Sequence, residues 1–198
     1  MNYRKAEPSD VADVAELATD AGGGLFEYCL GGAPTRETAE GVGLLISALE
    51  DGFSLSNAIV VTDENDGGKE TVAGTMIAYP ATEFAGEDTF ASFIQPELLA
   101  PVRGLFEPPS AASYYIHSLA VRPEFARRGI ASSLIEFAED TARGLGLPEV
   151  SLHVWADNHG AVAMYNRHGY ITQKVIPADV GDKLPHTGGM LLVSKTID

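Results

Sequence analysis

Residues 114–132 read YYIHSLAVRPEFARRGIAS, in which a strand pattern, a turn and a helix start follow one another. Six of the first eight positions are apolar or aromatic, which is typical of a central strand. Pro123 cannot donate to a sheet ladder, so the strand should end before it. From Ile130 onward the apolar residues recur at helical spacing, and Gly144 and Gly146 supply a helix stop. This stretch therefore predicts a strand, a turn and a long helix.

The turn has the properties of an anion site. Arg127, Arg128 and Gly129 stand at the helix start, where the first backbone N–H groups lack intrahelical partners and the helix dipole favours negative charge. The small residues Gly129 and Ala131 would let a phosphate approach the backbone. Three of the 13 Lys and Arg residues, including Arg122, fall within seven positions of a chain whose formal charge is −15. This concentration indicates a polyanionic ligand.

A second segment, residues 158–170, reads NHGAVAMYNRHGY. Asn158 can cap the helix that follows it, and Gly169 closes that helix. Tyr165 comes seven residues after Asn158, about two helical turns, so the two side chains share one face. Apolar segments on either side, 149–155 and 170–176, read as strands. The pattern is strand, helix, strand.

The two segments, in this order, resemble the GCN5-related N-acetyltransferase (GNAT) superfamily. Residues 121–131 look like its acetyl-CoA pyrophosphate loop, and residues 158–170 resemble its following strand–helix–strand motif. The sequence departs at Ala126, where the family usually has Arg or Gln. The resemblance implies one N-acetyltransferase domain over residues 1–198. It also implies an α/β fold in which a mixed, mostly antiparallel sheet splays between its fourth and fifth strands and carries helices on both faces.

The resemblance further implies acetyl-CoA as the co-substrate. Asn158 would contact CoA as well as cap its helix, and Tyr165 would protonate the departing thiolate; a tyrosine packed in the core is the alternative for Tyr165. Backbone groups of the central strand would hold the pantetheine arm, and the turn would hold the diphosphate. These cofactor-binding residues are Leu119, Ala120, Val121, Arg127, Arg128, Gly129, Ile130, Ala131 and Ser132.

The residues on the acceptor side are less constrained by pattern. His117 lies in the central strand and titrates near neutrality, so it is a candidate base for the acceptor amine; a histidine satisfied inside a packed strand is the alternative. The apolar stretch 25–30 and the long segment 82–113 are expected to wall the acceptor pocket. The first could instead fold over the core, and the second could form a homodimer surface. The candidate pocket residues are Phe26, Glu27, Tyr28, Glu83 and Phe106.

Composition narrows the class of protein. The length suits one domain, and a pI near 4.6 argues against nucleic-acid binding. No apolar run approaches the ~20 residues that cross a bilayer, so no membrane partner is expected. The first residues show no signal-peptide hydrophobic region, and the single Cys29 fits a reducing compartment, so we expect a cytoplasmic protein. The histidines lack a metal-ligand pattern, and no metal is expected.

The predicted reaction is acetyl transfer to a primary amine of a small molecule, by direct attack in a ternary complex. A peptide N-terminus is an alternative acceptor, and a non-catalytic acyl-CoA-binding domain is an alternative class. Tyr165 favours an enzyme, because a binding domain could dispense with it. A dinucleotide-binding oxidoreductase would instead show G-x-G-x-x-G after an N-terminal strand, which this sequence lacks.

The remaining elements follow from periodicity and turn residues. A strand is expected over residues 3–6, and a helix starting near Pro8 runs to about residue 20. A second helix capped by Thr35 should bury Leu44 and its neighbours. Residues 57–62 and 71–79 read as a hairpin around the turn 65–68, a short helix follows Pro96, and residues 189–196 form a last strand.

Overall fold

The computed structural model describes residues 1–64, 70–84, 86, 89, 94–178 and 180–198. The strands are β1 (Asn2–Lys5), β2 (Ala58–Glu64), β3 (Glu70–Pro80), β4 (Ser113–Val121), β5 (Glu149–Trp155), β6 (Ile171–Ile176) and β7 (Met190–Thr196). The α-helices are α1 (Val11–Gly22), α2 (Leu25–Cys29), α3 (Thr35–Ala48), α5 (Pro96–Leu99), α6 (Ile130–Gly144) and α7 (His159–Arg167). A 3₁₀ turn, Pro8–Asp10, leads into α1, and another, Ala100–Phe106, follows α5.

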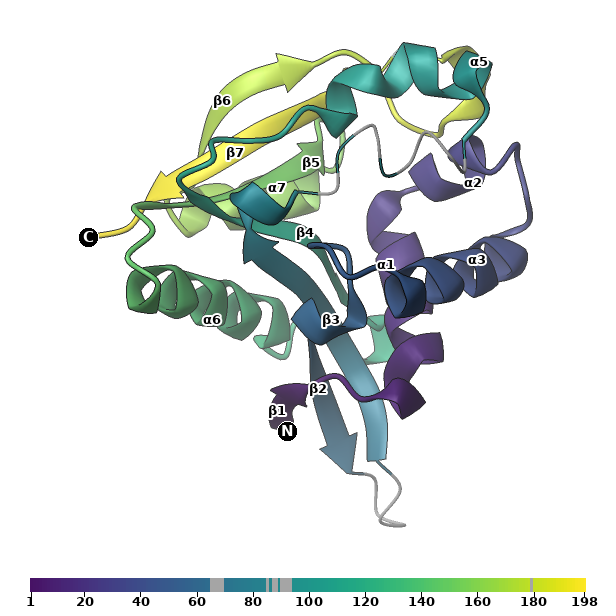
Figure 1. Cartoon of the computed structure of the whole chain (residues 1–198). Helices are drawn as coiled ribbons and strands as arrows, with labels where there is room; N and C mark the ends of the chain where they lie inside the picture. Colours follow the sequence, from purple (N-terminus) through teal and green to yellow (C-terminus); the bar gives the residue numbers. More distant parts are fainter. Residues whose placement is uncertain (65–69, 85, 87–88, 90–93, 179) are drawn as a thin grey trace.

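The strands form one sheet in the order β1-β2-β3-β4-β5-β7-β6 (Figure 1). Every neighbouring pair is antiparallel except β4 and β5, which are parallel. Their pairing covers only Ser113–Ile116 against Glu149–Leu152, although β4 continues to Val121. The sheet therefore opens between these strands beyond Ile116. This confirms the expected mixed, mostly antiparallel sheet that splays between its fourth and fifth strands.

Helices cover both faces of the sheet, and each face has its own core (Figure 1). On one face α1 packs on β3 and β4 through Val14, Leu17 and Ala18, with α3 against its outer side. On the other face α6 packs on the same strands through its fully buried Leu134 and Ile135. Because side chains of both cores pack on β4, this strand is fixed in position where the sheet opens.

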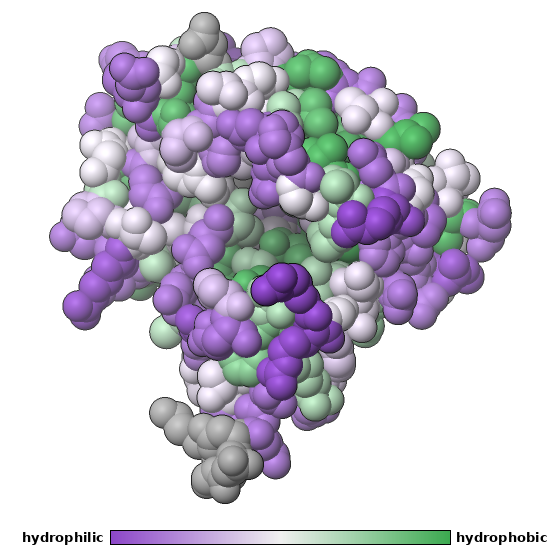
Figure 2. Space-filling model, turned by 180° about the vertical axis from the view of Figure 1, so that it is seen from behind, coloured by the Kyte–Doolittle hydropathy of each residue, from purple (hydrophilic) through white to green (hydrophobic). Residues whose placement is uncertain are grey.

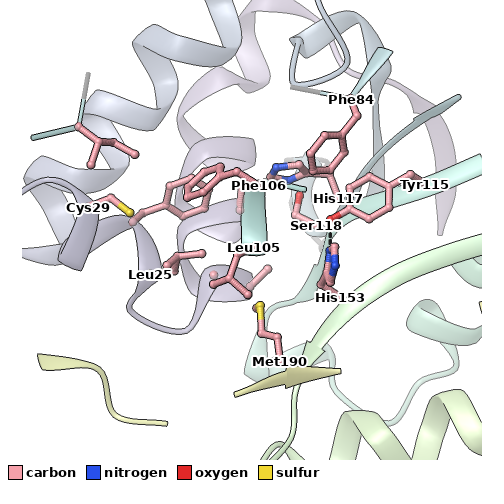
Figure 3. Close-up of a pocket in the computed structure, with 15 residues that line it drawn as sticks. Leu25, Cys29, Phe84, Leu105, Phe106, Tyr115, His117, Ser118, His153 and Met190 are labelled. Atoms are coloured by element: carbon pink, nitrogen blue, oxygen red, sulfur yellow. Dashed lines mark hydrogen bonds between the residues drawn. The ribbon is translucent and has the colours of Figure 1, made fainter. Parts of the chain in front are cut away.

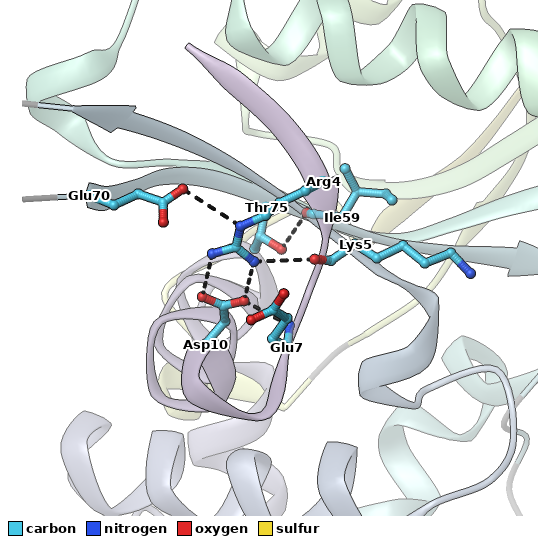
Figure 4. A network of polar contacts seen from close by, with 7 residues as sticks. All are labelled: Arg4, Lys5, Glu7, Asp10, Ile59, Glu70 and Thr75. Atoms are coloured by element: carbon cyan, nitrogen blue, oxygen red, sulfur yellow. Dashed lines mark hydrogen bonds and ion pairs between the residues drawn. The ribbon is translucent and has the colours of Figure 1, made fainter.

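A polar network ties the start of the chain to the sheet (Figure 4). The Arg4 guanidinium donates two hydrogen bonds to the Asp10 carboxylate, at 2.6 and 3.0 Å, and Asp10 also accepts the Glu7 backbone N–H at 2.7 Å. Glu70 of β3 lies 3.6 Å from the same guanidinium. These hydrogen bonds lower the pKa of the buried Asp10 carboxyl, despite its burial. The network fixes the entry of α1 against β1 and β3.

Three local predictions need correction. The stretch after the first glycine run is a short helix, α2, rather than irregular chain. Thr35 is not a cap but the first residue of α3, which Pro34 precedes without a side-chain cap. Leu44 is 75% exposed, because α3 turns Val42 and Ile46 toward the core instead. The predicted turn at residues 65–68 lies outside the described residues; the strands before and after it are confirmed.

Candidate active site

A groove of about 450 Å³ lies where β4 and β5 part. Leu119, Ala120 and Val121 of β4 line it; these are residues that the family resemblance assigns to the pantetheine arm. Beyond Ile116 the β5-facing edge of β4 makes no ladder pair with β5. Backbone donors and acceptors on this edge are thus available to an extended ligand that carries amide groups. The lining continues to Pro123, at the entry of the arginine turn.

The arginine turn leads into α6 as predicted. Gly129 has φ 85°, in the left-handed region that glycine adopts without strain, and α6 starts at Ile130 without a side-chain cap. No described atom lies within 4 Å of the position that a Cβ of Gly129 would take. Ala131 follows on the first turn, while the Ser132 hydroxyl lies 3.0 Å from Nε2 of His168. The open, uncapped N-terminus of a 15-residue helix fits a phosphate group.

The three arginines near this turn have different partners. Arg122 forms ion pairs with Asp13 and Glu16 of α1, at 2.5 and 2.7 Å, so it braces the sheet and does not contribute to the predicted polyanion site. Arg128 pairs with Asp63 at 3.2 Å. Arg127 has φ 61°, unusual for a residue with a side chain, and within the described part of the chain its side chain makes no ion pair. As far as the described residues go, Arg127 is therefore the cation of the turn that has no ion-pair partner.

The second predicted motif closes the other side of the groove. The Asn158 side-chain oxygen accepts the Ala161 N–H at 3.1 Å and so caps α7. Asn158 and Tyr165 both line the groove, so the helical spacing brought them to one face as expected. Tyr165 is 6% exposed, and burial raises the pKa of its phenol. Its hydroxyl stays protonated and can act only as an acid at neutral pH.

A second, mostly apolar cavity of about 90 Å³ lies on the α1 side of β4 (Figure 3). Rings of Phe84, Phe106 and Tyr115 surround it, together with aliphatic side chains from α2 and the 3₁₀ turn after α5. The Tyr115 hydroxyl lies 2.8 Å from Nδ1 of His153 on β5. Burial lowers the pKa of His153 to about 4, so this histidine is neutral near pH 7. The cavity suits an apolar group.

The two cavities meet at His117 and Ser118, which line both. The His117 ring stacks on Phe53, with centroids 4.3 Å apart. Burial, with a smaller contribution from His153, lowers the pKa of His117 to about 3. Nδ1 of His117 and Oγ of Ser118 are buried and have no hydrogen-bond partner among the described residues. Two polar atoms without partners therefore mark the junction of an apolar pocket with a polar groove.

The predicted pocket residues divide into two groups. Phe26 and Phe106 line the apolar cavity. Tyr28 is 5% exposed and belongs to the core, and Glu27 and Glu83 do not line either cavity. The space-filling view shows hydrophobic residues in a hollow that hydrophilic residues surround (Figure 2).

Sequence patterns did not mark several residues that the fold brings to this region. Trp155, Met190 and His186 line the groove, and Asp20 lies at its edge, at the end of α1. The Trp155 indole N–H donates to the Gly22 carbonyl at 3.0 Å, which joins β5 to the end of α1. No local sequence signal could have found His186, because it lies in the loop between β6 and β7.

Among the described residues, no three His, Cys, Asp or Glu side chains are grouped as metal ligands. None of the helices in the described ranges is long and apolar enough to cross a membrane. Cys29 is buried, and its burial raises the pKa of the thiol to about 12, so the thiol is not activated as a nucleophile.

Comparison with known proteins agrees with this geometry. An N-acetyltransferase from Staphylococcus aureus Mu50 has 20% identity and a TM-score of 0.70, with 98% of this chain and 100% of that chain covered. The PaiA N-acetyltransferase from Thermoplasma acidophilum, in complex with coenzyme A, has 13% identity and a TM-score of 0.56, with 98% of each chain covered. A chain of the NatC complex bound to Gag peptide and CoA has 14% identity and a TM-score of 0.55, with coverage of 100% and 98%.

These likenesses concern the fold. The family assignment comes from the sequence, since residues 54–170 match the model of the acetyltransferase (GNAT) family. The matched range contains β2 to α7, and hence β4, the arginine turn and Tyr165. It confirms the expectation of an acyltransferase that uses acetyl-CoA. This chain belongs to the acetyltransferase (GNAT) family.

Proposed function

We propose that this enzyme transfers the acetyl group of acetyl-CoA to a primary amine of a small molecule that carries one compact apolar group. The observation that supports this proposal is the junction at His117 and Ser118, where the apolar cavity opens into the groove between β4 and β5. A thioester in the groove and an amine held by its apolar group would meet at this junction.

The groove has the features that a CoA thioester needs. The edge of β4 at Leu119–Val121 would hold the amides of the pantetheine arm, and the α6 N-terminus at Gly129 would hold the diphosphate. Acetyl-CoA supplies the activated acetyl group. Asn158 caps α7 with its side-chain oxygen and lines the groove, so it would both orient that helix and contact CoA.

The apolar cavity limits the acceptor. An apolar cavity of roughly 150 Å³ can hold benzene, so one of about 90 Å³ suits a smaller group, such as a short branched alkyl chain. Carboxylates attract the amine: Asp20 borders the groove, and its pKa is raised by burial and by the neighbouring Glu16 and Glu27. An ammonium ion arriving here would find negative charge at the entrance and an apolar pocket inside.

Tyr165 and His117, which both line the groove, have complementary roles in this proposal. Tyr165 donates a proton to the departing sulfur, because its buried phenol is protonated at neutral pH. His117 is neutral, since burial lowers its pKa to about 3, and it offers a hydrogen bond to the acceptor or to the acetyl carbonyl. A pKa so low makes His117 a weak base.

The proposal is tested by thiol release from acetyl-CoA with a panel of amines. Isobutylamine places a branched alkyl group in the cavity and ethanolamine does not, and fully burying such a group is worth about 1.5–3 kcal/mol, roughly a ten- to hundredfold higher kcat/KM for isobutylamine. A short peptide with a free N-terminus, and the same peptide blocked, are assayed in parallel.

The outcomes distinguish a small amine from a peptide as the acceptor, and an enzyme from a binding domain. Thiol release with amines but not with peptide supports the proposal. Release with the free peptide alone would move the acceptor to the peptide class. CoA binding without release for any acceptor would indicate an acyl-CoA-binding domain.

A further inference from the structure

A histidine and an aspartate form a pair at the wall of the groove. Asp157 lies two residues after the end of β5, and His186 lies in the loop between β6 and β7. Oδ1 of Asp157 is 2.8 Å from Nδ1 of His186, and Oδ2 accepts the Thr187 backbone N–H at 2.7 Å. The imidazole lies flat on the Trp155 indole, with centroids 4.4 Å apart and planes 10° apart. The carboxylate and the indole together fix the orientation of the ring.

This orientation determines the tautomer of the ring. With Nδ1–H donating to the Asp157 carboxylate, neutral His186 carries its free lone pair on Nε2. Nε2 is buried and has no hydrogen-bond partner among the described residues. The same ring lines the groove that Tyr165, His117 and Ser118 also line. An oriented nitrogen without a partner among the described residues therefore lies at the wall of the groove that would hold the thioester.

Only a glycine turn separates this nitrogen from the groove. Gly23 has φ 60°, lines the groove, and approaches His186 so closely that a Cβ at this position would collide with Nε2. Among the described residues, the Trp155 indole donates to the Gly22 carbonyl, the Gly23 N–H donates to the Asp20 carbonyl, and the Gly24 carbonyl accepts the Tyr28 N–H. Because Gly23 and Gly24 tolerate a wide range of backbone angles, the turn can shift when an acceptor enters.

We propose that His186, oriented by Asp157, is the general base of the acetyl transfer. The inference rests on the proposed function. The acceptor nitrogen forms a bond to the acetyl carbon while its proton passes to Nε2 of His186. The carbon–sulfur bond breaks, and the sulfur takes the proton of Tyr165. Solvent then carries the proton of the imidazolium away and reprotonates Tyr165, which restores both residues.

The charges around His186 and His117 favour His186 as the base. The Asp157 carboxylate lies 2.8 Å from Nδ1 of His186, so a positive charge that forms on the ring during the transfer has an anionic partner. The hydrogen bonds from Thr187 and His186 lower the pKa of that carboxyl. Around His117 there is no comparable carboxylate contact among the described residues, and burial keeps it neutral. The other titratable groups around His186 are Asp20, His117 and Tyr165 along the groove and Asp182 in its own loop.

The test compares pH profiles of kcat for one acceptor, taken from the amine panel, across four variants. His186→Gln keeps a polar side chain but cannot take up a proton, so kcat should fall about 10²–10⁴-fold and the acidic limb that belongs to the enzyme should disappear. His117→Gln should retain the limb. His159→Gln, an exposed histidine at the start of α7, is the matched control and should behave as the wild type. Ionisation of the acceptor is common to all variants, so differences between profiles belong to the enzyme.

Asp157→Asn gives a second, independent readout. Without the carboxylate the imidazolium is less stable, so the acidic limb should move to lower pH while the enzyme stays active. A purely structural role for the pair would lower the unfolding temperature without moving this limb. Asp157→Asn still decides the question if His186→Gln does not fold.

The outcomes separate the two proposals. The inference is overturned if His186→Gln retains the wild-type profile with kcat within tenfold, or if Asp157→Asn leaves the limb in place. If the wild type releases no thiol with any acceptor, the proposed function itself fails, whatever the variants show. CoA affinity, measured by calorimetry, should stay within about twofold in all four, because none of these residues is assigned to CoA.

Discussion

The two arginines of the turn differ in their ion-pair partners, so replacing them one at a time tests which of them binds a phosphate of CoA. Arg128 pairs with Asp63 at 3.2 Å, and its guanidinium lies 5.3 Å from the centre of the Phe125 ring. Arg127 makes no ion pair with any described residue. To reach a phosphate, Arg128 must leave Asp63, whereas Arg127 loses no partner. We predict that Arg127→Ala weakens CoA binding more than Arg128→Ala.

The size of the effect follows from exposure. Both arginines are exposed, and exposed ion pairs contribute about 0.2–1 kcal/mol, which corresponds to about a 1.4- to 5-fold change in Kd. Arg127→Ala should raise the Kd of CoA by this factor at low salt. Arg128→Ala should change Kd less, because in the wild type any contact of Arg128 with phosphate costs its ion pair with Asp63. Ala126→Arg adds a cation before the turn and should lower Kd.

A backbone control is needed because Arg127 has a left-handed conformation. Alanine keeps the unfavourable φ of 61°, whereas glycine relieves it. If the guanidinium matters, Arg127→Gly and Arg127→Ala should raise Kd equally, although Arg127→Gly unfolds at a different temperature. Calorimetric titration of CoA and 3′-dephospho-CoA at two salt concentrations makes the comparison. An effect that does not shrink with salt, or a larger effect from Arg128→Ala, would refute the reasoning.

Three further predictions follow from the described contacts. Tyr165→Phe should lower kcat by about 10²–10⁴ and leave the acetyl-CoA Kd nearly unchanged in calorimetry; wild-type turnover would remove Tyr165 from the mechanism. Phe26→Ala and Phe106→Ala should raise the acceptor KM and spare the acetyl-CoA KM, whereas Tyr28→Ala, in the core, should mainly lower the unfolding temperature. Asp10→Asn should lower the free energy of unfolding by about 1.5–3 kcal/mol at pH 7. Because the folded-state pKa of Asp10 is lowered, its contribution is complete above about pH 4 and is lost as pH falls through that pKa, so denaturation near pH 2 should show a smaller difference.

The parts of the fold that could be predicted are those that depend on the spacing of residues close together in the sequence. A strand, turn and helix at residues 114–144 depend on local spacing, and so does the pairing of Asn158 with Tyr165 on one helix face. The sheet order and its opening came from the family resemblance. Local periodicity alone does not contain them, because they depend on which distant strands pair.

The register of α3 shows why hydrophobic spacing can mislead. The helix contacts α1 through Gly43, where a Cβ would lie 3.4 Å from Val11 and 3.5 Å from Ala15. The buried stripe therefore runs along Val42 and Ile46, beside a residue with no side chain, and Leu44 faces outward. Arg122 is a similar case. Its charge suggested a phosphate ligand, but it contacts acidic residues of α1, more than 100 positions away in sequence.

The position of the reaction site follows from the short pairing of β4 with β5. A parallel ladder that ends at Ile116 leaves the remainder of β4 with one edge free toward β5, while both cores hold the strand in place. A register shift between Ile77 and Ala78 of β3 interrupts the alternation of side chains along β4. His117 therefore packs on Phe53 at the α1-side core, whereas Leu119 packs on the α6-side core. One short stretch can thus serve the apolar cavity through its side chains and the groove through its backbone. His186 and Asp157 reach the same place only because β7 returns beside β5, which brings the loop before β7 against the end of β5. The position of the proposed base therefore depends on the sheet order. Shortening the β6–β7 loop should abolish general-base catalysis by His186 even when the arginine turn still binds CoA.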